Sequence, residues 1–455
     1  MPSSSSIEPL YFLGIGGIGM SALARWFAAR GCRVEGYDRT PSPLTRELEK
    51  EGIRVIYTDS PEQVADMPWT VVRTPAVPEQ TALYQHFEKK GARILKRSEM
   101  LGRVTEDMRA LCVAGTHGKT STAALLAHIL RPQGVNAFLG GISMNEGSNL
   151  ITDSQSNLVV VEADEFDRSF LHLKPSMSVI TAIDPDHLDI YGTPEGYQEG
   201  FEQYARLVKE AVVIRKGYHV DGNGTARLYQ YSVNEPSDFY SDNIRITDGR
   251  LLFDWHTPDT VLTDVELGVP VLFNVENATA AMAVASLAGA DEQMLRQGVQ
   301  TFKGVLRRFN IHVRTNRITY IDDYAHHPQE LMTAIRSARQ LYPERYLIGV
   351  FQPHLYTRTR DFMDGFAAAL GALDEAVLLP IYPAREEPIE GITSETLADR
   401  IHGSQPVRVV QKTDMVEYVC HRLRTLDRPV TVLTLGAGDI DRLVDGLASK
   451  LKETN

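Results

Sequence analysis

The fold is decided by the stretch LCVAGTHGKTS at residues 111–121. It opens with the apolar run Leu111–Ala114, expected to be a buried strand, and leads into the apolar run Lys119–Leu130, expected to be a helix. The glycines between them let backbone N–H groups converge on a phosphate at the helix N-terminus. The loop departs from the eight-residue Walker consensus, because Val113 replaces its first glycine. The stretch therefore predicts a parallel α/β domain that binds a nucleoside triphosphate.

The side chains of this loop have the chemistry that a triphosphate requires. The Lys119 ammonium would neutralise the terminal phosphates, and the Thr120 hydroxyl would coordinate Mg2+. A purely structural turn is the alternative. The residues expected to contact ATP in this loop are Gly115, Thr116, His117, Gly118, Lys119, Thr120 and Ser121.

Acidic groups follow the next two β-branched runs of the central segment. One run ends at Glu162-Ala163-Asp164-Glu165, and the other precedes Asp-His-Leu-Asp at residues 186–189. Because parallel strands end at one edge of a sheet, these groups could reach a magnesium ion held by Thr120. The residues leave open which carboxylate of the first run, Glu162 or Glu165 among them, would bind this ion, and His187 is a candidate ligand of a second metal ion. Solvated loop acids are the competing interpretation.

A second glycine-rich turn, Gly14–Gly19, follows the apolar run Leu10–Leu13. It fits the pattern G-x-G-x-x-G, and Asp38 stands at the end of the next apolar run. By rule this is a dinucleotide fingerprint. The same geometry suits any nucleotide diphosphate, so the residues leave open NAD, another diphosphate and a purely structural turn.

Arginine, histidine and acidic residues gather after strands of the last third of the chain. They occur in the three runs Arg307–Phe309, Asp322–Pro328 and His354–Arg360. Arginine binds carboxylates and phosphates through two parallel hydrogen bonds. These runs therefore predict a site for an anionic substrate, although an isolated arginine pair is usually solvated.

Length and composition indicate three globular domains. The 455 residues are 43% hydrophobic and carry a formal net charge of −12, which disfavours a nucleic-acid surface. Residues 1–108, 109–312 and 313–455 are the expected domains. The alternation of strands and helices predicts α/β layers, and residues 212–269 are expected to form β-hairpins or a meander, with turns at Asp221–Gly224 and Asp248-Gly249.

Three further expectations concern the environment of the chain. The three cysteines lack metal-ligand spacing, and Cys32 and Cys112, in or near apolar runs, are expected to be buried thiols. The serine-rich start carries no positive charge before an apolar stretch, which does not fit a signal peptide. No run is long enough for a membrane-spanning helix, so no membrane insertion and a cytoplasmic location are expected.

In combination, these motifs resemble the Mur ligases over nearly the whole chain, closest to the branch that adds L-alanine. The resemblance is most specific in the runs Asp323–Pro328 and Tyr356–Asp361. It implies a Rossmann-like UDP-binding domain, a central P-loop ATPase-like α/β domain and a Rossmann-like C-terminal domain that binds the amino acid. It also implies ATP-dependent ligation of L-alanine to the lactyl carboxylate of UDP-N-acetylmuramate, through an acyl phosphate, in peptidoglycan precursor synthesis.

The resemblance implies roles residue by residue. The UDP-sugar, rather than NAD, would be held by Gly16, Gly17, Ile18, Gly19, Asp38, Thr74 and Pro75. Beyond the phosphate loop, ATP would be contacted by Asn274, Asn277 and Arg308. Two Mg2+ ions would be held by Thr120, Glu162 and His187. The amino acid and sugar carboxylate would be bound by Tyr324, His326, Arg358 and Arg360. The catalytic residues would be Lys119, Arg308 and His326.

Two departures and several alternatives accompany the resemblance. Phe273 stands where the family commonly has a histidine before the asparagine of its adenine motif, and no lysine follows His187 to bridge two magnesium ions. An NAD-dependent oxidoreductase, a non-catalytic nucleotide-regulated protein and a ligase that recycles a tripeptide are the competing functions. A monomer or weak homodimer is expected. Glycine and L-serine remain possible amino acids.

Overall fold

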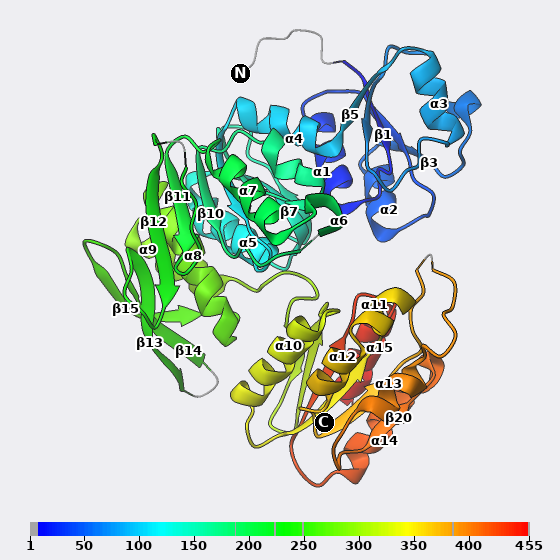
Figure 1. Ribbon diagram of the computed structural model, residues 1–455, viewed down its shortest axis with the longest axis vertical. Helices are drawn as coiled ribbons and strands as arrows, with labels where there is room; N and C mark the ends of the chain where they lie inside the picture. The colour runs from blue at the N-terminus through cyan, green and yellow to red at the C-terminus, as the bar shows by residue number, and fades with distance from the viewer. Residues whose placement is uncertain (1–7, 187, 223, 248–249, 385, 454–455) are drawn as a thin grey trace. The chain divides into compact units, whose positions relative to one another are not determined.

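A computed structural model describes residues 8–186, 188–222, 224–247, 250–384 and 386–453 (Figure 1). They form two compact units. The first comprises the chain up to Val269 together with Asn274–Lys303, and the second comprises Pro270–Phe273 and the chain from Gly304 onward. The first unit contains two sheets and the second contains one.

The N-terminal sheet is wholly parallel, with the order β3-β2-β1-β4-β5. Its strands are β1 (Leu10–Leu13), β2 (Val34–Tyr37), β3 (Arg54–Ile56), β4 (Thr70–Arg73) and β5 (Arg93–Lys96). Its helices are α1 (Ile18–Ala28), α2 (Pro43–Lys50), α3 (Ala82–Lys89) and α4 (Arg97–Glu106). The chain runs from β1 to β2 and β3 on one side of β1 and then crosses to β4 and β5 on its other side, which places the glycine turn at a topological switch point.

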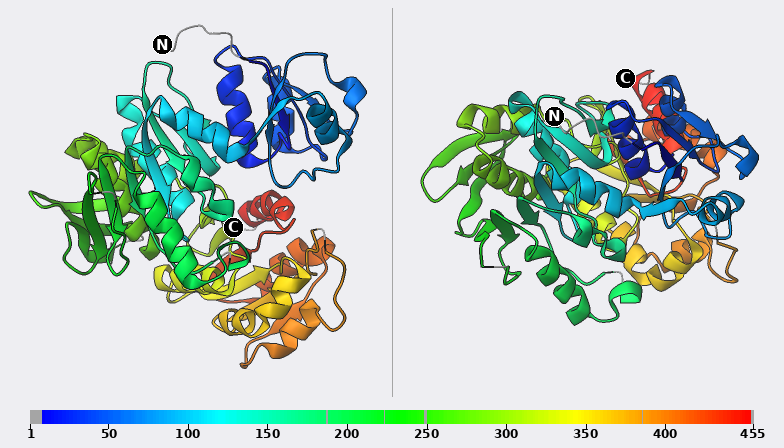
Figure 2. Two further views of the ribbon diagram at one scale, coloured as in Figure 1. Left: turned by 45° about the horizontal axis from the view of Figure 1, so that its top comes forward. Right: turned by 90° about the horizontal axis from the view of Figure 1, so that it is seen from above.

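Helices cover both faces of this sheet, whose strands are blue in Figure 2. Side chains of β1 alternate between two buried clusters. Leu10 and Phe12 pack with residues of α1, whereas Tyr11 and Leu13 pack with residues of α3. This alternation follows from the two-residue period of a strand, and it confirms the Rossmann-like expectation.

The central sheet has ten strands in the order β15-β14-β13-β12-β11-β10-β6-β9-β7-β8. They are β6 (Arg109–Ala114), β7 (Asn136–Ser143), β8 (Ser148–Ile151), β9 (Leu158–Glu162), β10 (Met177–Ile180), β11 (Ala211–Arg215), β12 (Arg227–Val233), β13 (Phe239–Thr247), β14 (Arg250–His256) and β15 (Val261–Leu267). Its helices are α5 (Lys119–Leu130), α6 (Leu188–Tyr191), α7 (Pro194–Ala205), α8 (Leu272–Leu287) and α9 (Glu292–Thr301), and the 3-10 segment η3 (Phe166–His172) lies between β9 and β10. Strand β6 lies between β9 and β10, parallel to both, so the three loops that follow them meet at one edge.

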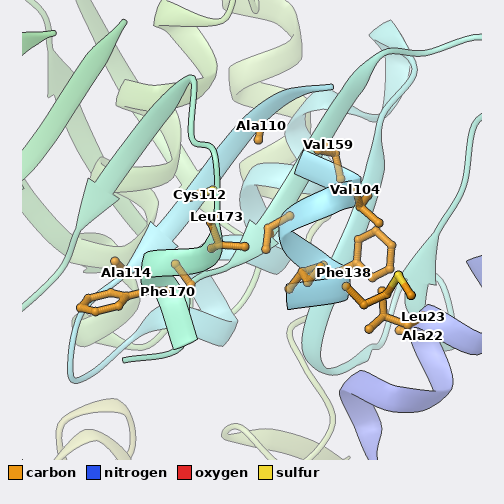
Figure 3. Packing of buried hydrophobic residues seen from close by; sticks show 14 of the residues in the cluster. Ala22, Leu23, Val104, Ala110, Cys112, Ala114, Phe138, Val159, Phe170 and Leu173 are labelled. Atoms are coloured by element: carbon orange, nitrogen blue, oxygen red, sulfur yellow. The ribbon is translucent and has the colours of Figure 1, made fainter. Parts of the chain in front are cut away.

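A continuous apolar core lies beneath this edge. Figure 3 shows Cys112 of β6 among packed side chains that include Val104 of α4 and Phe138 of β7. The same cluster contains residues of α1, so helices of the first domain share a core with the central sheet. Cys32 and Cys112 are buried and free, which confirms the prediction for them, and Cys420 is buried and free as well.

The expectation for residues 212–269 is partly confirmed and partly wrong. Strands β13, β14 and β15 do form antiparallel pairs. Strands β11 and β12 are parallel, as are β12 and β13, so the turn residues after β11 do not make a hairpin. Local turn chemistry fixes the bend but not the direction in which the next strand pairs. Asn223 of the first predicted turn and Asp248-Gly249 of the second lie outside the described residues.

The second unit carries a sheet with the order β16-β17-β21-β18-β19-β20. Its strands are β16 (Asn310–Arg314), β17 (Ile318–Asp323), β18 (Tyr346–Phe351), β19 (Glu375–Leu378), β20 (Val407–Val409) and β21 (Val430–Leu435). Its helices are α10 (Pro328–Leu341), α11 (Tyr356–Asp361), α12 (Met363–Leu370), α13 (Ser394–Arg400), α14 (Met415–Thr425) and α15 (Asp441–Glu453). The edge strand β16 is antiparallel, and the other neighbours pair in parallel. No helix among the described residues is long and apolar enough to cross a membrane.

One buried ion pair anchors a helix to this sheet, and it gives a stability prediction. Glu375 on β19 is fully buried, and Arg422 on α14 binds it with an Nη2–Oε2 distance of 2.7 Å. Replacing Arg422 with alanine leaves a buried carboxylate without its main partner, which costs about 3–5 kcal/mol. Urea unfolding of the full chain measures this loss.

The matched control is Arg424→Ala, an exposed arginine on the same helix. It is expected to change the free energy of unfolding by less than about 0.5 kcal/mol. Equal effects from the two substitutions would show that the Glu375 carboxylate does not depend on Arg422.

Candidate functional site

The phosphate loop is held in shape by the end of β10. Gly115 has a φ of +127°, and a Cβ added there would lie 2.2 Å from Thr181 Oγ1. Thr181 Oγ1 also donates to the Ala114 carbonyl at 3.2 Å, and the Thr116 N–H donates to the Ala182 carbonyl at 3.0 Å. The loop therefore needs glycine at position 115 because another strand end occupies the space of a side chain.

Two asparagines of α8 support the other end of the loop. A Cβ at Gly118, whose φ is +79°, would lie 2.6 Å from Asn277 Oδ1. Thr122 donates to the same oxygen at 3.2 Å, and Asn277 Nδ2 donates to Asn274 Oδ1 at 3.0 Å. The structure thus brings both predicted asparagines to the phosphate loop. Their contact with adenine stays a prediction.

Lys119 lies against a buried acid. Its Nζ donates to Glu165 Oε1 at 2.8 Å and to the Gly115 carbonyl at 2.6 Å. Burial raises the pKa of Glu165, while the charge of Lys119 acts in the opposite direction. The ammonium is therefore fixed over the loop where terminal phosphates would need a cation.

Thr120 lies against the other candidate acid. Its hydroxyl donates to Glu162 Oε1 at 2.9 Å, and the Gly140 N–H of β7 donates to Glu162 Oε2 at 2.9 Å. A hydroxyl and a carboxylate oxygen side by side are ligands that Mg2+ accepts while keeping several waters. The geometry separates the two acids, because Glu162 faces Thr120 and Glu165 faces Lys119.

The remaining predicted ligand, His187, lies outside the described residues. Within the described ranges, no group of three or more His, Cys, Asp or Glu side chains could hold a metal ion. The Thr120–Glu162 pair fits a magnesium ion whose other ligands come from water and phosphate oxygens.

The first glycine turn is closed by Asp38 and Thr74. The Gly16 N–H donates to Asp38 Oδ2 at 2.8 Å, and a Cβ at Gly14, where φ is +87°, would lie 2.5 Å from Thr74 Cγ2. Gly17 precedes the first residue of α1 in an extended conformation. The structure thus gathers most of the predicted UDP-sugar residues around the start of α1, with Pro75 exposed in the loop after β4.

A cluster of rings and charges forms in the second unit after β17 and β18. The Tyr324 and His326 rings meet edge to face at 5.2 Å, and His326 Nδ1 lies 3.3 Å from Glu330 Oε2. The ring of His354 lies 6.5 Å from that of His326, and Arg358 Nη1 lies 3.1 Å from His354 Nδ1. Burial first, and then the neighbouring Arg358, lowers the pKa of His354 to about 4.

His326 is likewise favoured in its neutral form. Burial is the main cause that lowers its pKa, and the Glu330 carboxylate opposes this shift. Burial alone would raise the pKa of Glu330, but His326 and two backbone N–H groups reverse the direction. A neutral imidazole can accept a proton at neutral pH.

The three arginines near this cluster differ in their contacts. Arg307 is held by the fold, because it donates to buried Asp322 at 3.1 Å and to the Gly436 carbonyl at 2.6 Å. Arg308 lies with its guanidinium 5.5 Å from the Tyr324 ring centroid. Arg360 pairs with its exposed neighbour Asp361 at 2.7 Å, so the structure does not bring it to the other predicted residues.

Sequence reasoning missed His354 and Glu330 as members of this cluster. His354 was visible only as part of a motif, and its facing of His326 depends on how β17 and β18 lie on either side of β21. Glu330 lies in the first turn of α10 and accepts hydrogen bonds from the His326 and His327 N–H groups at 3.0 and 3.3 Å, which brings its carboxylate against the His326 ring. A glutamate three residues after the N-cap, as in a capping box, was the available signal.

Fold and site define a three-domain α/β enzyme built around a phosphate-binding loop. Three family models match successive segments: "Mur ligase family, catalytic domain" at residues 9–109, "Mur ligase middle domain" at 113–285 and "Mur ligase, glutamate ligase domain" at 307–438. The chain belongs to the Mur ligase family.

Curated relatives extend the similarity over the whole chain. A UDP-N-acetylmuramate–L-alanine ligase of Porphyromonas gingivalis is 51% identical, covering 96% of this chain and 98% of its own length. A relative of the same name from Flavobacterium johnsoniae is 43% identical, with 99% of each chain covered. The crystal structure of UDP-N-acetylmuramate-alanine ligase MurC from Thermotoga maritima matches with a TM-score of 0.83 at 26% identity, covering 98% of this chain and 100% of that one.

The contact between Gly118 and Asn277 gives a prediction about the phosphate loop. Gly118→Ala would place a methyl group against Asn277 Oδ1 and force alanine into a left-handed conformation. We expect nucleotide affinity to fall at least about tenfold, because a loop that relaxes from the left-handed conformation must regain it to bind phosphate, at a cost of about 1–2 kcal/mol. Calorimetric titration with a non-hydrolysable ATP analogue measures this.

Gly147→Ala is the matched control. Gly147 also has a positive φ, +63°, but no atom lies within 4 Å of its added Cβ. Unchanged affinity in the control is expected. Unchanged affinity in Gly118→Ala would mean that the loop tolerates displacement of Asn277.

Proposed function

We propose that this chain joins L-alanine to the lactyl carboxylate of UDP-N-acetylmuramate, driven by ATP, in peptidoglycan precursor synthesis. The observation that carries the proposal is the phosphate loop with Lys119 at its tip and the Thr120–Glu162 pair beside it. Relatives that are about half identical to this chain over nearly its whole length are named UDP-N-acetylmuramate–L-alanine ligase, which supports the proposal. Residues 1–108, 109–312 and 313–455 are proposed to bind the UDP-sugar, ATP and the amino acid.

The first proposed step transfers the γ-phosphoryl group of ATP to the sugar carboxylate and forms an acyl phosphate. Negative charge spreads over the phosphoryl oxygens in the transition state, so fixed cations stabilise it. Lys119 is already oriented by Glu165 and the Gly115 carbonyl, so little reorganisation is required. Arg308 is proposed to stabilise the same negative charge on the phosphoryl oxygens. Thr120 and Glu162 would hold a magnesium ion, which supplies further charge neutralisation when bound.

In the second proposed step the neutral amine of L-alanine attacks the acyl carbon, and phosphate leaves. The amine must lose a proton, since an α-amino group has a pKa of about 8. His326 is proposed to accept it, because burial lowers the pKa of the imidazole and keeps it unprotonated. Tyr324 and Arg358, which lie around the two histidines, are proposed to bind the carboxylates.

Other assignments stay predictions. They are the magnesium role of His187, the adenine contacts of Asn274 and Asn277, and the substrate contact of Arg360. A second magnesium ion, a cytoplasmic location and a monomeric or weakly dimeric state are also predictions.

The function is tested by phosphate release with substrates omitted one at a time. Release is expected only when ATP, UDP-N-acetylmuramate and an amino acid are all present, and Lys119→Ala is expected to abolish it. A competition among L-alanine, glycine, L-serine and the tripeptide then identifies the amino substrate. Preference for the tripeptide would overturn the proposal in favour of peptide recycling.

The separation of the two acids predicts different phenotypes. Glu162→Ala removes a proposed metal ligand and is expected to raise the magnesium concentration for half-maximal rate at least about tenfold. Glu165→Gln leaves the Thr120–Glu162 pair in place and is expected to lower kcat without that shift. Magnesium titrations of both variants test this, and a shift confined to Glu165→Gln would move the ligand role to that residue.

The proposed base predicts a pH profile. Protonation of His326 as the pH falls would remove the base, so kcat is expected to drop below a midpoint that lies under 6.5. His326→Ala is expected to lower kcat about 10²–10⁴-fold and to remove this acidic limb. The control is His421→Ala, an exposed histidine on α14. An identical pH profile in His326→Ala at saturating alanine would exclude the role.

A further inference from the structure

Arg97 is a cation at the first glycine turn that neither glycine motif predicts. It is the first residue of α4, and its side chain lies over Gly19 at the start of α1. A Cβ placed at Gly19 would stand 2.8 Å from Arg97 Nη1 and 3.2 Å from its Cδ. Glycine at this position therefore makes room for the arginine side chain.

The two terminal nitrogens of Arg97 face different partners. Nη2 donates to Asp164 Oδ2 at 3.1 Å, whereas Nη1 lies toward Gly19. A guanidinium carries five N–H donors in a planar fork, so it can bind one anion at each edge. The side chains of Arg97 and Asp164 are 28% and 39% exposed, so a ligand can reach the pair from solvent.

Packing fixes the position of this arginine. Helix α4 lies tightly on η3, because a Cβ at Gly102 would approach the His172 carbonyl oxygen to 2.4 Å. The preceding residue, Lys96, makes a parallel ion pair with Asp167 at 2.7 Å. Two cations of the first domain are thus held by two acids of one central-domain loop.

That loop also carries the acids of the phosphate site. Within residues 162–167, Glu162 contacts Thr120 and Glu165 contacts Lys119, while Asp164 contacts Arg97. Asp164, the partner of Arg97, therefore lies in the chain between Glu162 and Glu165, the two acids that contact the ATP loop. Side-chain hydrogen bonds at both nucleotide sites thus converge on this one loop.

We propose that Arg97 binds the diphosphate of the uridine nucleotide through its Nη1 edge while Asp164 holds its Nη2 edge, and that this bridge couples occupancy of the two nucleotide sites. The inference rests on the proposed function, because it takes the Gly14–Gly19 turn as the UDP-sugar site. Arg97 is a binding residue in this scheme, and Asp164 is a positioning residue that acts through it.

A purely structural ion pair between Arg97 and Asp164 would explain fewer of these observations than a diphosphate ligand does. A pair of this exposure contributes about 0–1 kcal/mol to stability and needs no particular residue at position 19. It accounts for Asp164, but not for the close fit of the guanidinium over a glycine at the start of α1. A diphosphate ligand accounts for both edges of the arginine.

Calorimetric titration of the full chain with UDP and with uridine tests the diphosphate contact. Arg97→Ala is expected to weaken UDP binding at least about tenfold, the size of a lost charged hydrogen bond, and to leave uridine binding unchanged. Arg97→Lys keeps the charge but loses the fork, and an intermediate loss is expected. It also serves as the second variant should the alanine variant fold poorly.

Arg109→Ala is the matched control, since Arg109 pairs with Glu210 at 2.8 Å with similar exposure, 36% and 40%. Equal UDP affinity in Arg97→Ala, Arg97→Lys and the control overturns the inference. Failure of the unaltered chain to bind UDP overturns the proposed function instead.

The coupling is read from the UDP affinity with and without a saturating non-hydrolysable ATP analogue. The analogue is expected to change UDP affinity in the unaltered chain, and Asp164→Asn is expected to reduce this change at least about fivefold. A change of equal size in Asp164→Asn, or no change in the unaltered chain, overturns the coupling.

Discussion

The nucleotide end of the first unit depends on close packing of side chains against glycines of the phosphate loop. Thr181 fills the space beside Gly115, and Asn277 fills the space beside Gly118. These contacts fix the loop between β6 and α5, so Lys119 and Thr120 emerge in set directions. Because Lys119 and Thr120 are fixed in this way, Glu165 can contact the ammonium and Glu162 the hydroxyl.

Three cations and one hydroxyl group then pair with the acids around the loop. Each acid of the 162–167 segment meets a different group, and each contact is under about 3.2 Å. In the second unit, burial is the main cause that lowers the pKa of the His326 and His354 imidazoles, and it favours their neutral form. One unit therefore concentrates fixed charge, and the other supplies groups able to accept protons.

The sequence predicted those parts of the protein that depend on local pattern. The strand ending at Ala114 and the helix Lys119–Leu130 match the structure, because apolar periodicity and glycine chemistry act over a few residues. The hairpin or meander expected for β11 and β12 was wrong, because the direction in which two strands pair depends on the sheet as a whole. Whether Glu162 or Glu165 faces Thr120 also required the fold. The fold was also needed to show that Arg307, unlike Arg308, is bound by Asp322 and the Gly436 carbonyl. The position of Arg97 likewise could not be predicted from the sequence.

The alternation of contacts along residues 162–167 has a consequence for how this segment can vary. Neighbouring acids serve different partners, and Asp167 and Arg168 adopt left-handed backbone conformations that set the spacing. Exchange of one carboxylate for another alters a single contact. Loss or gain of one residue would shift every acid to the wrong partner at once. The segment is therefore constrained more strongly in its length than in its composition, and insertions or deletions should be rarer here than substitutions.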